Sequence, residues 1–159
     1  MVATRTSVLQ RGVIAGLAGG LAEVVWVAFY SEATGGNAAQ IASAVTTAAG
    51  ANALLPGMPV TMGIVVHMLL AVALGVALAF AWRGLASRAG GIAVPYLFVL
   101  AALIGVWTMN FFVILPLLSP AFITLLPYAV SLTSKLLFGL AAAETLRRLS
   151  ASAAVRAAA

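Results

Sequence analysis

Four polar side chains lie inside long apolar runs, and each is costly there unless another polar group meets it. They are Glu23, His67, Asn110 and Lys135. A charged side chain at the centre of a bilayer costs about 2.5–3.5 kcal/mol on insertion scales, so these groups must face one another or water. A carboxylate, an imidazole and an ammonium group at membrane depth can bind and pass protons. The same groups can also fix how helices pack, and both roles are open from the residues alone.

The apolar runs that hold these residues are each long enough to cross a bilayer, which takes about 20 residues. They cover residues 12–30, 59–82, 92–115 and 128–149, and a tail follows over residues 150–159. The first run also has the basic start of a secretory signal peptide, but its length and Glu23 favour a transmembrane helix. We therefore expect a single transmembrane domain over residues 1–159, an all-α integral membrane four-helix bundle.

The composition agrees with that class and excludes several others. Of 159 residues, 64% are hydrophobic and only 7% are charged, whereas a soluble domain carries about a quarter charged residues. The chain has no cysteine, which excludes disulfides and thiolate metal sites. It also has no aspartate and no HExxH, Walker or GxSxG motif, so a non-enzymatic role is expected. The basic residues lie at the ends of the apolar runs, which argues against a nucleic-acid partner.

The arginines predict the orientation in the membrane. If there are four spans, all of them fall on one side, while the other side holds Glu32 and no lysine or arginine. The positive-inside rule then places both termini in the cytoplasm, as in a multi-pass protein of a bacterial inner membrane. The residues concerned are Arg5, Arg11, Arg83, Arg88, Arg147, Arg148 and Arg156.

Two segments are expected outside the membrane on the far side. Residues 31–58 are rich in alanine, glycine and threonine, and a short helix over residues 38–49 capped by Asn37 is predicted there. This helix would lie at the interface or over the mouth of the bundle, with a re-entrant loop as the alternative. The second segment holds Pro116, Pro120 and Pro127, which should end the third helix and form a rigid hairpin.

Depth in the membrane pairs the polar residues. Glu23 lies twelve residues after Arg11, and Lys135 lies twelve residues before Arg147. At about 1.5 Å per residue, both side chains stand roughly 18 Å from the arginine boundary. We therefore expect a buried Glu23–Lys135 ion pair near the midplane. His67 and Asn110 should be hydrogen-bonded just above it, and Ser131 and Ser134 can join this polar cluster.

Small residues at a spacing of four predict where helices pack closely. They form one face in the first, second and fourth runs: Gly12, Gly16, Gly20, Ala71, Gly75 and Gly139. Residues 59–75 also align without gaps on residues 127–143, with a proline at the start of each and His67 opposite Lys135. This alignment predicts two repeated helical hairpins, related by an axis along the membrane normal.

The motifs RGVIAGLAGG, VHMLLAVALG, GVWTMNFFVILPLLSPA and SKLLFGL cover nearly the whole chain. Together they resemble a group of small bacterial four-helix inner-membrane proteins of unknown function. Some of that group are labelled sodium:proline symporters, but symporters of that class use ten or more spans with broken helices, which four short spans cannot build. Members of the group often have a histidine where this chain has Lys135.

These observations favour a small accessory or structural subunit of a larger membrane complex, or a homo-oligomer, as the function. The alternative is a proton-coupled carrier or channel that uses the Glu23, His67 and Lys135 side chains. A haem or metal site would need His67 together with a methionine, which is a weaker reading. No cofactor is expected, and the bilayer is the one partner that the composition requires.

Overall fold

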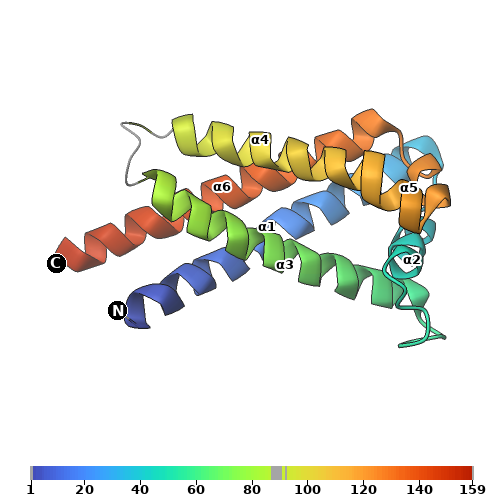
Figure 1. Ribbon diagram of the computed structural model, residues 1–159, viewed down its shortest axis with the longest axis horizontal. Coiled ribbons are helices and arrows are strands. Elements are labelled where there is room, and N and C mark those ends of the chain that lie inside the picture. Colours follow the sequence, from blue (N-terminus) through green and yellow to red (C-terminus); the bar gives the residue numbers. More distant parts are fainter. Residues whose placement is uncertain (1, 87–90, 92, 159) are drawn as a thin grey trace.

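The computed structural model describes residues 2–86, 91 and 93–158, with side chains placed from Val8 to Ser152 outside the gaps. All regular elements of the described part are helices. The long ones are α1 (Val2–Thr34), α3 (Pro59–Ala86), α4 (Ala93–Met109) and α6 (Tyr128–Ala158). Both termini lie at one end of the bundle, here called the terminal end, while α2 (Ala38–Ala48) and α5 (Leu115–Leu118) lie at the other, here called the α2 end (Figure 1).

Four helical stretches are long and apolar enough to cross a membrane, which confirms the expected all-α polytopic membrane protein. They are Val8–Thr34, Pro59–Leu85, Ala93–Leu118 and Tyr128–Ser152. The first helix is longer than its apolar run because residues 2–11 contain no glycine or proline to stop it. It ends where Gly35 takes a φ of +69°, a left-handed conformation that favours glycine and closes helices.

The short helix predicted after the first span is present as α2. The side chain of Asn37 accepts a hydrogen bond of 3.2 Å from the backbone N–H of Gln40, which caps the helix as expected. α2 packs across the end of α3, where the backbone of Ala42 lies directly against Gly63. The position over the bundle mouth is therefore the one adopted, and Gly63 is a close-packing glycine that the spacing pattern did not reveal.

The third span does not end at residue 115 as predicted. After Met109 the helix continues through a π-helical turn, Asn110–Ile114, and then through α5 to Leu118. The N–H of Leu115 donates to the carbonyl of Asn110, five residues back. Pro116 has no N–H, and its ring would crowd a carbonyl in the preceding turn of a regular α-helix. A wider turn at this point relieves the crowding, so the chain reverses only at Ser119, before the 3₁₀ turn Pro120–Thr124.

Glycines bring α1 and α3 into backbone contact. A methyl group on Gly12 would lie 2.6 Å from Cα of Val76, and one on Gly16 would lie 2.6 Å from Cα of Val72. Gly75 faces the backbone of Gly16 from the other helix. No side chain fits between the two helices there, and these glycines lie on the small-residue face that the spacing of four predicts.

Gly20 and Ala71 extend the same seam, whereas Gly139 packs against α4. A methyl on Gly139 would lie 2.8 Å from a side-chain carbon of Leu103. Ala71 and Gly139 thus each contact the first helix of their own hairpin, the arrangement that two repeated hairpins would have. The repeat itself stays a prediction from the sequence.

The apolar core fills the half of the bundle nearer the termini. Phe138, Val99 and Leu103 are 0% exposed and are joined there by Leu146, Leu78 and Trp82. The core thus draws on α3, α4 and α6 as well as on Ala15 of α1. The polar residues in the middle of the bundle lie at the edge of this core that faces the α2 end.

We predict that Gly75→Ala destabilises the protein by about 1–3 kcal/mol, because the new methyl must push α3 away from the α1 backbone. Gly105→Ala is the matched control, since nothing lies within 4 Å of a methyl at that helical glycine. The free energy of unfolding in detergent micelles measures both. Equal stability of the two variants would contradict the close contact.

Candidate functional site

Glu23 and Lys135 form an ion pair inside the bundle. Nζ of Lys135 lies 2.8 Å from Oε1 and 3.0 Å from Oε2 of Glu23, so it contacts both carboxylate oxygens. The hydroxyl of Ser134 donates a third hydrogen bond of 3.1 Å to Oε1. Glu23 is only 3% exposed, and this set of donors compensates for its removal from water. The pairing of α1 with α6 agrees with the equal depths derived from the sequence.

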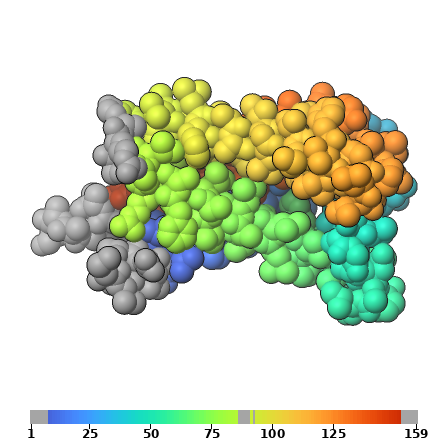
Figure 2. Space-filling model, viewed as in Figure 1, coloured from blue at the N-terminus to red at the C-terminus, as the bar shows by residue number. Residues whose placement is uncertain are grey.

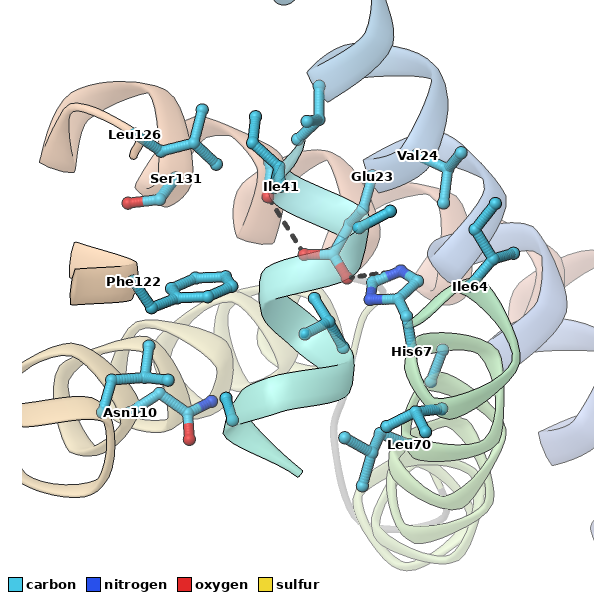
Figure 3. A pocket seen from close by; sticks show the side chains of 18 of the residues that line it. Glu23, Val24, Ile41, Ile64, His67, Leu70, Asn110, Phe122, Leu126 and Ser131 are labelled. Carbon is cyan, nitrogen blue, oxygen red and sulfur yellow. Dashed lines mark hydrogen bonds and ion pairs between the residues drawn. The ribbon is translucent and has the colours of Figure 1, made fainter. Parts of the chain in front are cut away.

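His67 approaches the same carboxylate from α3. Its Nε2 lies 3.8 Å from Oε2 of Glu23 and 3.3 Å from the carbonyl oxygen of Gly20. The second contact lies at the close seam between α1 and α3, where a methyl group on Gly20 would lie 2.7 Å from Cβ of Ala71. Figure 3 shows the imidazole of His67 directed at the Glu23 carboxylate. Three helices therefore meet at one carboxylate.

Two residues predicted for this cluster do not bond to it. Asn110 and His67 line the same cavity but lie well apart in Figure 3, and no side-chain hydrogen bond joins the two among the described residues. Ser131 instead accepts a hydrogen bond of 3.0 Å from the indole N–H of Trp107 and donates to the carbonyl of Tyr128. It ties α4 to α6 at the α2 end. Distance along the helix placed both residues at a suitable depth, but it did not tell which way they face.

These polar residues line a cavity of about 830 Å³, which we call the Glu23 cavity. Its walls come from all the spans and from α2, and most are apolar side chains such as Ile41, Val45, Val106 and Phe122. The surface is hollowed between α3 and the yellow to orange segment that ends in α5 (Figure 2). The volume lies in the range of small-molecule sites, roughly 300–1,000 Å³. All six polar residues predicted to form the cluster line it: Glu23, His67, Asn110, Ser131, Ser134 and Lys135.

The exposed fractions define what a molecule in the cavity would meet. The side chains of His67 and Lys135 are 26% and 19% exposed, against 4% for Glu23. Of the three residues, which all line the cavity, His67 and Lys135 are therefore the more accessible, and Glu23 is almost fully covered. His67, Glu23 and Lys135 also form a contiguous row of titratable groups, along which a proton can be held or passed. Among the described residues, no three metal-binding side chains gather at one place.

A second polar group lies near the terminal end. Glu144 pairs with Arg148, as its spacing on the helix indicates, but it also accepts two hydrogen bonds from Arg147. The hydroxyl of Tyr96 donates to the same carboxylate at 2.5 Å, which connects α4 to α6. Arg88 belongs to the predicted arginine boundary but lies outside the described residues.

We predict that Glu23→Gln lowers the free energy of unfolding by up to about 3–5 kcal/mol, because Lys135 loses its counter-charge. Adding Lys135→Met should restore much of the loss, since the double variant removes both charges. Unfolding in detergent measures four proteins, namely the unchanged protein, Glu23→Gln, Lys135→Met and the double variant, with Glu32→Gln as a control at an exposed carboxylate. A double variant as unstable as the sum of its two single changes would refute the pair.

The geometry described above is the basis for a functional assignment, because comparison with known proteins gives no lead. No protein-family model, curated protein or solved structure matches the chain. The chain is thus placed as a polytopic membrane protein by its four apolar helices, and its Glu23 cavity is the candidate site.

Proposed function

We propose that this protein is a small proton-coupled carrier that binds an amphipathic molecule in the Glu23 cavity. The observation that carries the proposal is the position of the ion pair on the wall of a cavity. Polar groups that only fix helix packing are expected in densely packed surroundings, because dense packing excludes water and holds the pair in place. Here Lys135 and His67 instead border open space.

The lining of the cavity indicates the class of substrate. Side chains such as Ile41, Val106 and Phe122 offer an apolar surface, and the polar groups are confined to a small part of the wall. A molecule with an apolar body and one anionic group fits this pattern, since the anion can bond to Lys135 and His67. The hollow on the side wall of the bundle suits a substrate that partitions into the bilayer (Figure 2).

Binding of such an anion would couple its movement to a proton. An anionic group on Lys135 competes with Glu23 for the ammonium charge. A carboxylate that loses its cation in a low-dielectric site is costly, so Glu23 would then take up a proton. One anion and one proton enter together, and the site keeps its net charge throughout.

The positions of the arginines indicate which side of the membrane the cavity faces in this proposal. With both termini in the cytoplasm of a bacterial inner membrane, the α2 end and the Glu23 cavity face the outside. The buried core around Phe138 closes the path toward the cytoplasm. This conformation would be the one that receives substrate from the outer half of the bilayer.

An accessory subunit is the rival proposal, and one feature favours it. α3 and α4 touch each other little, so the hollow between them can accept a helix or side chains of a partner protein. Large apolar side chains are exposed nearby, including Leu69 and Leu70. In that case the cavity would be filled within a complex and would carry no substrate.

We predict that Val106→Cys reacts with a charged, membrane-impermeant thiol reagent added outside cells, because Val106 lines the cavity and its polar wall requires water. Leu103→Cys is the matched control, one helical turn away and 0% exposed. The chain has no cysteine of its own, so any labelling reports the introduced thiol. Reaction only from the cytoplasmic side, or equal reaction of both variants, would contradict the outward-facing cavity.

Proton flux separates the two functions. In liposomes with a trapped pH dye and no membrane potential, an inward gradient of an alkyl sulfonate, a permanently charged amphipathic anion, should make the protein acidify the lumen well above the liposome background. Glu23→Gln should reduce the rate to that background, and so should Glu23→Gln with Lys135→Met, which keeps the fold. Glu32→Gln, an exposed carboxylate, should leave the rate unchanged. Absence of flux together with stoichiometric co-purification of another membrane protein would support the accessory role instead.

A further inference from the structure

A second hollow lies at the terminal end, between α1, α3 and α6. Its volume is about 290 Å³, and we call it the Arg11 hollow. Its lining residues include two arginines, Arg11 and Arg83, and one serine, Ser150. Trp82 and Leu146 supply apolar walls that are nearly buried, at 5% and 1% exposed. It is separate from the Glu23 cavity, with which it shares no lining residue.

Within the part of the chain that the structure describes, no carboxylate pairs with either arginine of this hollow. Among the described residues, neither guanidinium group takes part in a hydrogen bond or an ion pair. Glu144, the carboxylate on the same part of α6, is already held by Arg147, Arg148 and Tyr96. The hollow therefore concentrates positive charge that a bound anion would neutralise.

We propose that the Arg11 hollow binds the phosphate of an anionic phospholipid headgroup. Arginine is the residue whose planar donors match phosphate oxygens best, and two arginines with a hydroxyl can surround one phosphate. Basic pockets between membrane helices are sites where lipid headgroups bind. The volume is too small for a whole lipid, so only the headgroup enters, and the acyl chains stay outside in the bilayer.

The depth of the hollow favours a lipid over a soluble anion. Arg11 directly precedes the first apolar run, residues 12–30, and Arg83 directly follows the second, residues 59–82. The arginines thus stand at the boundary between hydrocarbon and water, where lipid phosphates are found. Trp82 beside them is the kind of residue that prefers this level of the membrane.

The test measures lipid binding by native mass spectrometry in a neutral detergent, where no charged bilayer surface adds a general attraction. We expect phosphatidylglycerol to bind at least about tenfold more tightly than phosphatidylcholine. Arg11→Gln and Arg83→Gln should each weaken phosphatidylglycerol binding by about tenfold, because a hydrogen bond to a charged group is lost. Arg148→Gln is the matched control: it removes one arginine at the same end that does not line the hollow, and should change binding less than twofold.

Three results would overturn the proposal. The first is equal binding of the two lipids by the unchanged protein. The second is a loss in Arg148→Gln as large as that in Arg11→Gln, which would mean a general charge effect. The third is displacement of phosphatidylglycerol by an equal concentration of inorganic phosphate or glycerol 3-phosphate, which would make the hollow a site for soluble phosphates. None of these readouts depends on transport activity, so they stand apart from the carrier proposal.

Discussion

The arrangement of the bundle depends on the bond between Glu23 and Lys135. Either charge alone is costly in hydrocarbon, and the main compensation that a chain of such low polarity offers is the opposite charge on another helix. The contact joins the first span to the last and sets their heights relative to each other. His67 then becomes the third member, because the glycine seam brings α3 against α1 at the same level. Electrostatics and close packing thus select the same relative placement of three helices.

Two kinds of packing divide the molecule along its length. Toward the termini, Phe138, Leu103 and Leu146 fill the interior between the helices. Toward α2, the spans separate, and the short helix covers the opening instead of filling it. The polar groups lie where these two regions meet. A molecule that enters from the α2 end would therefore reach the charged groups at the deepest point accessible to it.

Counting residues from a shared boundary predicted the ion pair, because helical rise is nearly constant and the arginines mark one level. Counting residues could not tell which way a side chain points around the helix axis. Asn110 shows the difficulty most clearly: it begins a π-helical turn, which no pattern in the sequence announced although Pro116 gives its cause. Ser131 and Ser134 are three residues apart, and only the partner helices decide that one meets Trp107 and the other Glu23. Gly63 was missed because the partner that requires it, α2, is too short to be placed from its own residues.

The pairing of Glu23 with Lys135 also constrains how the sequence of such a chain can change during evolution. Single substitutions come one at a time, so one member of the pair must disappear before the other. A stranded carboxyl group can become neutral at pH 7 at a cost roughly 1 kcal/mol smaller than a stranded ammonium group, because its ordinary titration point lies nearer neutrality. Replacing the lysine first is thus the less destabilising order of substitution. Descendants that keep the acid at position 23 with an uncharged partner at 135 should outnumber those with the reverse combination.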